Sequence, residues 1–323
     1  MEQPLSQRAG HFLRKAGFRR FVVKAGYFVL TVIRKPFVKL RDRTSDAELQ
    51  KKLANLPRDN GHVAIRVLDF TMKVRADDPG LSKELILDGV REQDAVQYPR
   101  PHLARCETII EIGANQGYYL IQEGLYSPAG ARIHAFEPHP QNVATAELNA
   151  RLNGIDAKCR LLQAAVSDGA GKGQLSVSSR SNWHKVGGVG GENLEFSGET
   201  IDVDMISLDE YCAQVGIDRV DLIRMDVEGH ETAVIRGARQ TIARSPDLLI
   251  FMEFHTSLMR QAGESPERFL EELRDLGLRC VTVCGKGRYL TEPSWEELIQ
   301  GLELITARYG THMFFAAKDG RRC

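Results

Sequence analysis

The 323-residue chain is predicted to adopt a doubly wound, Rossmann-like α/β fold over most of its length. From Glu107 onward, short apolar segments alternate with amphipathic ones, which is the pattern of parallel strands joined by crossover helices. Two of the apolar segments end in a glutamate, Glu111 and Glu137, 26 positions apart. A glycine-containing turn follows the first glutamate and opens a helix. Together these features predict an open sheet whose strand ends meet at a ligand-binding edge.

The expected elements follow one another along the chain. Seven core strands are predicted, at Thr108–Ile112, Arg132–Phe136, Arg160–Val166, Leu222–Asp226, Leu248–Phe254, Cys280–Cys284 and His312–Ala317, with a further strand at Thr200–Ser207. One helix is predicted to begin at Gly117, and three others are predicted at Gln141–Asn153, Glu231–Arg244 and Pro266–Leu276. A strand over His62–Val74 and a helix over Lys83–Gly89 precede them, and the Gly-rich stretch Gly169–Gly198 is expected to include a short hairpin.

The first 43 residues differ from the rest of the chain in charge. They contain eleven Lys and Arg residues against two acidic ones, although the whole chain has a formal net charge of zero. Aromatic and aliphatic side chains lie between these charges, and a helix is predicted over Gln7–Arg34, ended by Pro36. Such a helix can lie in a membrane interface; packing on the domain or on a second subunit, or partial disorder, is the alternative. We therefore expect an arm and linker over residues 1–60 and a domain over residues 61–323.

The sequence also predicts a location. The longest apolar run, Phe21–Ile33, is interrupted by Lys24, whereas a spanning helix needs about 20 apolar residues. Basic residues follow this run instead of a small-residue cleavage site. The six cysteines are scattered and match no common zinc spacing, so we expect reduced thiols. These features predict a cytoplasmic protein, with the arm as a candidate for peripheral contact with the inner face of the membrane.

The turn after the first strand carries the strongest ligand-binding signal. It reads Gly113-Ala114-Asn115-Gln116-Gly117-Tyr118. Gly113 lets the backbone approach a ligand closely, and Gly117 lets the helix start near the sheet. The G-x-x-x-G spacing lacks the central glycine of dinucleotide binders, which fits a ligand without a pyrophosphate. A methionine-type amino acid end can sit here, with Glu111 near its ammonium group, although an ordinary strand–helix turn would look the same.

The ends of the second and third strands supply further binding candidates. Glu137 ends the second strand, where a carboxylate can accept hydrogen bonds from both hydroxyls of a ribose. Pro138 fixes the turn after it, and Asn142 belongs to the same segment. At the end of the third strand, the small side chains of Ala164 and Ala165 would admit a flat adenine ring. A plain buried strand end explains these alanines equally well.

Three titratable residues follow the fourth strand within one turn. Asp226, Glu228 and His230 lie beside the first strand, at the point where the strand order reverses and ligands collect. They are the candidate catalytic residues, although Glu228 could instead place negative charge at a helix N-terminus. Glu253 and His255 end the fifth strand and could face the same pocket, where they could hold a divalent ion with Asp226. Because the facing of these side chains cannot be read from sequence, we predict no metal.

These segments resemble the FkbM-type methyltransferase family. Its signatures are a D-x-G-A-N-x-G turn, an A-F-E-P-x-P strand end and a K-x-D-V-E-G-x-E turn, which match Glu111–Gly117, Ala135–Pro140 and Arg224–Glu231, within a resemblance that spans Ser82–Phe254. The resemblance implies the mixed seven-stranded sheet of class I methyltransferases and S-adenosyl-L-methionine as the methyl donor. It also implies O-methylation of a sugar, glycan or secondary-metabolite hydroxyl. A methyltransferase of lipid or protein acceptors, or a non-catalytic cofactor-binding relative, is the alternative.

This sequence departs from the family pattern at four positions. Glu111 replaces the usual Asp, Gln116 replaces a usual aliphatic residue, and Arg224 and Met225 replace Lys and Ile. Arg cannot give up its proton, so Arg224 would not supply any role that depends on a neutral Lys. The rest of the chain after the arm is net acidic and lacks an N-P-P-Y-like motif, so no nucleic-acid partner is expected.

The resemblance and the residues together give the expected roles. A hydroxyl acceptor needs a base to take its proton, and we predict His230 as this base and Asp226 as the positioning group, with the roles interchangeable. The catalytic candidates are therefore Asp226, His230 and Glu228. The expected cofactor-binding residues are Glu111, Gly113, Ala114, Asn115, Gly117, Tyr118, Glu137, Pro138, Asn142 and Ala165. The expected partner is a small-molecule or glycan acceptor, and a homo-oligomer is left open.

Overall fold

The computed structural model describes residues 45–187 and 196–317. The chain divides into two compact units, Met1–Asn55 and Leu56–Cys323. In the first unit, residues 45–54 form a helix. The predicted basic arm, residues 1–43, lies outside the described residues, so its helix and its membrane contact stay predictions. Within the described ranges, every helix is too short or too polar to cross a bilayer.

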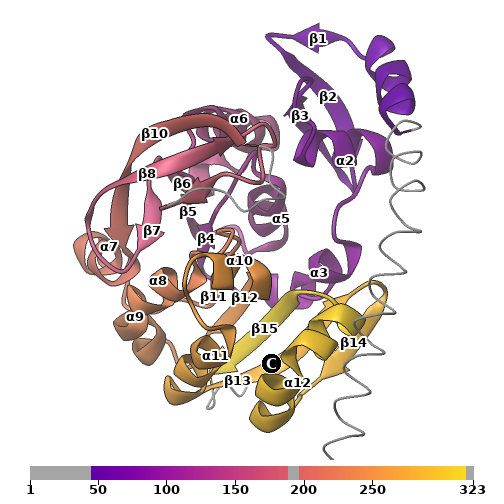
Figure 1. Cartoon of the computed structure of the whole chain (residues 1–323). Helices are drawn as coiled ribbons and strands as arrows, with labels where there is room; N and C mark the ends of the chain where they lie inside the picture. The colour runs from indigo at the N-terminus through magenta and orange to yellow at the C-terminus, as the bar shows by residue number, and fades with distance from the viewer. Residues whose placement is uncertain (1–44, 188–195, 318–323) are drawn as a thin grey trace, which may run out of the picture. The chain divides into compact units, whose positions relative to one another are not determined.

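The second unit contains an eight-stranded mixed sheet (Figure 1). Across the sheet the order is β14 (Arg288–Thr291), β13 (Leu278–Gly285), β15 (His312–Ala317), β12 (Leu249–Glu253), β11 (Leu222–Met225), β4 (Thr108–Ile112), β5 (Arg132–Phe136) and β6 (Cys159–Leu162). Neighbours from β6 to β12 are parallel, whereas β15, β13 and β14 join antiparallel. The strand order reverses between β4 and β11, so the carboxyl ends of these two strands form the switch point.

The observed sheet differs from the predicted one in two ways. It has an eighth strand, β14, which follows β13 through the tight turn at Lys286 and Gly287 and pairs with it at the sheet edge. The predicted strand Arg160–Val166 is two strands, since β6 joins the central sheet and β7 (Ala165–Ser167) joins another one. The chain breaks at Gln163 and Ala164 because successive parts of it hydrogen-bond to different neighbours.

Side chains of the central strands point alternately to the two faces of the sheet, and both faces are buried under helices. Ile110 and Ile112 of β4 belong to a hydrophobic core with residues of α7 (Leu208–Val215), α8 (Glu231–Arg236), α9 (Arg239–Arg244), α10 (Thr256–Gln261), α11 (Pro266–Asp275) and α12 (Trp295–Tyr309). The other face of β4 carries Ile109 and Glu111, and α5 (Tyr118–Tyr126) contacts β4 and β5. The segment Glu231–Arg244, predicted as a single helix, forms two helices, α8 and α9, which are separated at Gly237 and Ala238.

The second unit also contains two smaller sheets. One has the order β1 (Arg58–Asp59), β2 (His62–Val67), β3 (Phe70–Arg75), so the strand predicted over His62–Val74 is a hairpin that turns at Leu68. The short helices α2 (Leu81–Asp88), α3 (Gln93–Gln97) and α4 (Arg100–Leu103) follow it. The other sheet has the order β7, β10 (Phe196–Ser207), β8 (Gly171–Ser178), β9 (Lys185–Val186). The hairpin expected in the Gly-rich stretch is β8 and β9.

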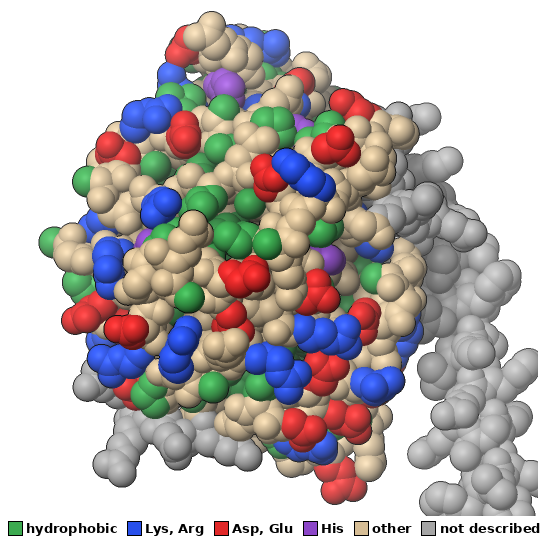
Figure 2. Space-filling model, turned by 90° about the vertical axis from the view of Figure 1, so that its left-hand side faces the viewer, with side chains coloured by type: hydrophobic (Ala, Val, Ile, Leu, Met, Phe, Trp, Pro, Cys, Tyr) green, Lys and Arg blue, Asp and Glu red, His purple; other side chains and the backbone are tan. Residues whose placement is uncertain are grey.

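The face shown in Figure 2 has no single sign of charge. Acidic and basic side chains are interspersed on it, and its hydrophobic side chains occur in small groups. Over the described residues visible there, the face lacks the broad basic stripe that is typical of nucleic-acid binders.

The turn after β4 approaches the end of β11 so closely that adding one methyl group at Gly113 is predicted to destabilise the fold strongly. A Cβ on Gly113 would lie 2.1 Å from the carbonyl oxygen of Asp226, and Gly113 has φ +83°. We expect Gly113→Ala to reduce the free energy of unfolding by about 3 kcal/mol or more, from backbone strain plus this clash. Urea denaturation measures it, with Gly130→Ala as the control because a Cβ there meets nothing within 4 Å. A Gly113→Ala protein as stable as the control would contradict the described turn.

Candidate active site

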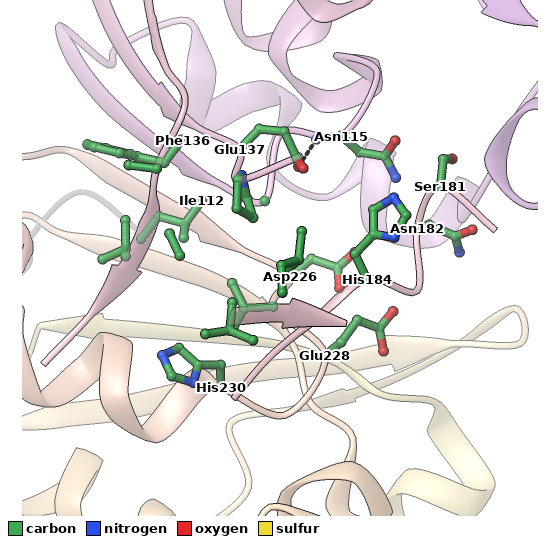
Figure 3. Close-up of a pocket in the computed structure, with 18 residues that line it drawn as sticks. Ile112, Asn115, Phe136, Glu137, Ser181, Asn182, His184, Asp226, Glu228 and His230 are labelled. Atoms are coloured by element: carbon green, nitrogen blue, oxygen red, sulfur yellow. Dashed lines mark hydrogen bonds between the residues drawn. The ribbon is translucent and has the colours of Figure 1, made fainter. Parts of the chain in front are cut away.

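A pocket of about 560 Å³ lies at the carboxyl ends of β4, β5 and β11 (Figure 3). Its lining comes from the ends of β4, β5 and β11, from the start of β7, and from β8, β9 and the segment between them. It consists of Ile112, Gly113, Asn115, Phe136, Glu137, Pro138, Ala164, Ala165, Val166, Leu175, Ser181, Asn182, His184, Val186, Asp226, Val227, Glu228 and His230.

Glu137 is held rigidly at the end of β5. Its Oε2 accepts a hydrogen bond from the backbone N–H of Asn115 at 2.9 Å, and its Oε1 accepts from the backbone N–H of His139 at 2.9 Å. Asn142 Nδ2 lies 3.4 Å from the same Oε1. Burial raises the pKa of Glu137 to about 7, and these hydrogen bonds oppose the shift. A carboxylate has about four acceptor positions, so Glu137 can still accept a hydrogen bond from a ligand.

One end of the pocket is apolar. Phe136, Ala165, Val166 and Leu175 line it, and each is nearly fully buried. Ala165 and Leu175 pack together in a small core between β7, β8 and β10. Small and aliphatic side chains here leave space for a flat ring, as the alanines of the third predicted strand suggested.

The turn after β4 is fixed by a buried polar network around Gln116. Its Nε2 lies within hydrogen-bond distance of Asp78 Oδ2 at 2.8 Å, Ser82 Oγ at 3.0 Å and Ser181 Oγ at 3.1 Å. Asp78 also accepts from the backbone N–H of Ser181 at 2.9 Å. The network connects the turn to the segment between β8 and β9. The departure from the family at Gln116 thus has a structural role, because an aliphatic side chain could not make these bonds.

The segment between β8 and β9 forms one wall of the pocket. Ser181, Asn182 and His184 line it. The His184 ring stacks on His139 with ring centroids 4.2 Å apart, and its Nδ1 accepts from the backbone N–H of Ser178 at 3.0 Å. Burial lowers the pKa of His184 to about 3, so the imidazole is neutral at physiological pH and its other nitrogen carries the proton.

Arg224 lies behind the pocket, buried between two carboxylates. Its Nη1 is 3.0 Å from Glu111 Oε1, and its Nη2 is 3.2 Å from Asp226 Oδ2. Nη1 also donates to the carbonyl oxygen of Gly113 at 3.2 Å, and the guanidinium lies 4.1 Å from the centroid of the Tyr119 ring. Glu111 was expected beside a ligand's ammonium group, but it is fully buried and is outside the pocket lining. The reason is strand alternation, because Glu111 and Arg224 are register partners on the covered face.

Two carboxylates point into the pocket from the turn after β11. Burial raises the pKa of Asp226 to about 6, with Glu253 adding to the shift and Arg224 opposing it. Burial also raises the pKa of Glu228 well above its ordinary value, with Asp226 and Glu253 adding to the shift. Glu228 has φ +52°, a conformation that non-glycine residues rarely adopt and that is concentrated at functional sites. In Figure 3 both side chains point toward Asn182 and His184.

His230 lines the same pocket but faces another part of it. Its Nε2 lies 3.0 Å from Ser167 Oγ, and burial lowers its pKa. Figure 3 shows its ring pointing away from the carboxylate of Glu228. The three catalytic candidates therefore share one pocket, with the imidazole near β7 and the carboxylates on the other side.

Only some of the remaining predicted cofactor-binding residues line the pocket. Asn115, Pro138 and Ala165 line it, whereas Ala114 and Tyr118 line a smaller adjoining cavity with Arg91. Gly117 caps α5 at φ +91°, where a Cβ would meet Ala146 of α6 (Pro140–Leu152) at 3.3 Å. Asn142 acts through Glu137 and also donates to the carbonyl oxygen of Ser181.

Sequence reasoning missed several residues around the site. Arg91, Ser181 and Asp78 were not among the candidates, because they come from segments without a recognisable motif. A signal for Ser181 and Asp78 exists only in Gln116, an unexpected buried polar residue that needs partners.

Glu137 also predicts a pH dependence of stability. Its pKa of about 7 in the folded protein, against an ordinary 4.5, means that the folded chain keeps a proton that the unfolded chain releases. The stability that Glu137 contributes is thus fully present below the unfolded-state pKa of 4.5 and is lost as the pH rises through the folded-state pKa of about 7. Glu137→Gln stays neutral, so we expect it to gain about 3 kcal/mol relative to wild type between pH ~4.5 and pH ~8. Urea denaturation across this range tests it, with exposed Glu147→Gln as the control; parallel curves would refute the assignment.

Comparison with known proteins places this geometry in a family. Residues 111–280 match the model of the methyltransferase FkbM domain. The chain is 28% identical over 177 residues to the 2-O-methyltransferase NoeI of Sinorhizobium fredii, covering 51% of this chain and 70% of NoeI. It is 27% identical over 175 residues to the 31-O-demethyl-FK506 methyltransferase FkbM of Streptomyces tacrolimicus, covering 44% of this chain and 66% of that protein.

Solved structures show weaker similarity. An O-methyltransferase from Bacillus cereus aligns with a TM-score of 0.40 at 12% identity, over 85% of this chain and 90% of that chain. A methyltransferase FkbM from Methylobacillus flagellatus aligns with a TM-score of 0.39 at 13% identity, over 85% and 59%. Because the match to the family model spans more than half of the sequence, the chain belongs to the FkbM methyltransferase family and is an S-adenosyl-L-methionine-dependent methyltransferase.

Proposed function

We propose that this chain transfers a methyl group from S-adenosyl-L-methionine to a hydroxyl oxygen of a sugar, glycan or secondary metabolite. The observation that carries the proposal is the pair of buried carboxyl groups, Asp226 and Glu228, which line the pocket next to the Gly113 turn. Carboxyl groups can accept and donate hydrogen bonds to a hydroxyl acceptor. The two curated relatives support the same chemistry, since both are named for O-methylation.

The pocket residues fit the methyl donor. Glu137 has acceptor capacity for the two ribose hydroxyls, and the apolar end beside Phe136 suits the adenine ring. The turn at Gly113 and Asn115 lines the pocket, and the amino acid end of the donor would lie against it. Asn182 Oδ1 and His184 Nε2 are buried without a hydrogen-bond partner among the described residues, and a bound ligand can supply one. When bound, the donor supplies a methyl group on a positively charged sulfur.

The acceptor needs a group that removes its proton. We assign this role to Asp226, because its carboxylate lies at the end of β11 and its second oxygen is oriented by Arg224. Burial raises the pKa of Glu228, and in its protonated form this group can donate a hydrogen bond to the acceptor. The bond between His230 and Ser167 favours a binding role for the imidazole. This exchanges the roles that the sequence suggested for Asp226 and His230.

Glu137→Ala tests the donor site. We expect its affinity for S-adenosyl-L-methionine to fall by about 1–3 kcal/mol, the usual effect of losing hydrogen bonds to a charged group. Isothermal titration calorimetry measures this, with Glu147→Gln as a control on the exposed face of α6. An unchanged affinity would remove Glu137 from ribose binding.

Asp226→Asn and His230→Ala separate the two base assignments. We expect Asp226→Asn to lower the single-turnover methylation rate of a hydroxyl acceptor by about 10²–10⁴-fold, the usual contribution of a general base. His230→Ala should lower it by less than about 10-fold. Donor affinity, measured in parallel, should stay within a few-fold in both. The reverse ranking of rates would return the base role to His230, and near-normal turnover in both would bring His255 forward.

A further inference from the structure

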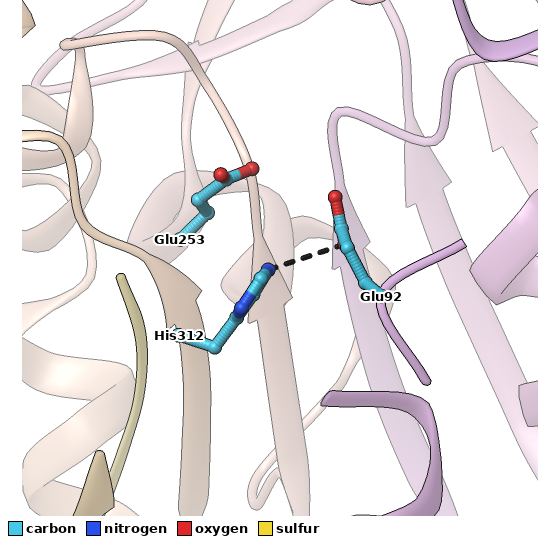
Figure 4. Close-up of side chains that lie close together, drawn as sticks. All are labelled: Glu92, Glu253 and His312. Carbon is cyan, nitrogen blue, oxygen red and sulfur yellow. Dashed lines mark ion pairs between the residues drawn. The ribbon is translucent and has the colours of Figure 1, made fainter. Parts of the chain in front are cut away.

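Three potential metal ligands meet beside the active site. Glu253 ends β12, His312 begins β15, and the two are direct cross-strand partners in the antiparallel pair. Glu92 reaches them from the residue before α3, and Figure 4 shows the three side chains converging. One ligand atom from each residue lies within 4.8 Å of the others. Strand pairing thus fixes two of the positions, and a distant segment of the chain adds the third.

The spacing of two of these atoms suits one bound ion. Glu92 Oε2 lies 3.2 Å from His312 Nε2. Two neighbouring ligands of one ion, at bond lengths of about 2.1 Å, are roughly 3 Å apart. His312 is only 9% exposed, and its Nε2 forms an ion pair with Glu92 but no hydrogen bond of good geometry among the described residues. As a neutral imidazole, this buried nitrogen is available as a metal ligand.

The two carboxylates are oriented by their other neighbours. Glu92 contacts the Arg91 guanidinium through Oε1 and accepts from the Tyr119 hydroxyl at 2.8 Å. Glu253 Oε1 lies 3.0 Å from His255 Nε2. Such outer contacts are what holds ligating carboxylates in place in metal sites.

The backbone supports the same interpretation. Glu92 has φ +51° and ψ +48°, a left-handed conformation that costs a non-glycine residue of order 1–3 kcal/mol. Strain of this kind persists at functional sites, where the position of the side chain matters more than the local energy. The conformation carries the Glu92 side chain to Glu253 and His312.

Charge gives an independent reason for a cation. Arg224 is shared between Glu111 and Asp226, and Arg91 lies against Glu92. Glu253 meets no Lys or Arg among the described residues within ion-pair distance, and its nearest basic partner is His255. A divalent cation would offset this excess of negative charge.

We propose that Glu92, Glu253 and His312 bind a divalent metal ion, with its remaining coordination positions open. Two carboxylates and one imidazole suit Mn²⁺, Fe²⁺ or Zn²⁺ better than Mg²⁺ or Ca²⁺, which prefer oxygen ligands alone. The proposal departs from the sequence prediction of no metal. In addition, and resting on the proposed O-methylation, the open positions would hold the acceptor hydroxyl beside Asp226, because Glu253 ends the strand next to β11.

Metal binding by the full chain tests the site without any donor or acceptor. We expect the chelator-treated protein to bind about one Mn²⁺ or Zn²⁺ per chain in equilibrium dialysis, read out by elemental analysis. His312→Gln and Glu253→Gln should each weaken binding at least ~10-fold, whereas Glu296→Gln, on the exposed side of α12, should not. Pulsed electron paramagnetic resonance of bound Mn²⁺ should show a nitrogen coupling that is absent in His312→Gln. Thermal unfolding of each variant confirms that it is folded.

Two outcomes would overturn the proposal. The first is no stoichiometric binding, which would make the cluster an ion pair only. The second is binding that survives unchanged in folded His312→Gln and Glu253→Gln proteins. Either result leaves the O-methylation proposal intact, since that one is judged by turnover. Conversely, a protein that binds Mn²⁺ as expected but methylates no hydroxyl acceptor would keep the metal site and lose the proposed function.

Discussion

The buried guanidinium of Arg224 holds the two central strands of the site together. It joins Glu111 of β4 to Asp226 at the end of β11 and donates to the carbonyl oxygen of Gly113 between them. Burying three ionisable groups costs several kcal/mol for each one that is charged, which is recovered only when the geometry and the hydrogen bonds are good. Here the planar guanidinium bonds both carboxyl groups and the Gly113 carbonyl oxygen at once and lies over the Tyr119 ring. The Gly113 turn, which lines the proposed donor site, is fixed through this interaction.

Two departures from the family pattern now explain each other. A family member with Asp and Lys at these positions has a shorter acid and a compact ammonium group, whereas this chain has Glu111 and Arg224. In the register of β4 and β11 they are directly opposite. The longer glutamate and the forked guanidinium form a cross-strand pair, and the fork leaves a second donor for Asp226. Each substitution looks mild alone, but the structure uses them as a pair.

How much of the site could be predicted depended on how local its signal was. Gly113, Glu137 and Asp226 could be identified because each ends a strand of a parallel sheet, and such ends meet at one edge whatever the rest of the chain does. The direction in which a side chain points was harder to predict. Glu111 sits on the covered face of its strand, and His230 bonds to Ser167, which is 63 residues away in sequence. Neither fact follows from a motif.

The fold showed the same division between local and long-range signals. Core strands could be predicted because they are short buried runs, but the break between β6 and β7 could not, since it depends on which neighbour each segment pairs with. Glu92, Glu253 and His312 lie far apart in sequence, and only the antiparallel pairing of β12 with β15 and the left-handed turn at Glu92 bring them together. The periodic patterns that indicate strands and helices contain no information about such long-range contacts.

The concentration of acidic groups at this edge raises a question about catalysis. Methyl transfer from a sulfonium removes a positive charge from the reacting sulfur, so fixed negative charges beside it would stabilise the reactants more than the transition state. Burial reduces this penalty, because it raises the pKa of Glu228 well above its ordinary value and that of Asp226 to about 6. When it is protonated, Glu228 can bond to the acceptor without holding the positive charge in place. The same burial makes Asp226 a stronger base than an exposed carboxylate, so in the proposed mechanism low polarity around the turn after β11 would favour both donor and acceptor.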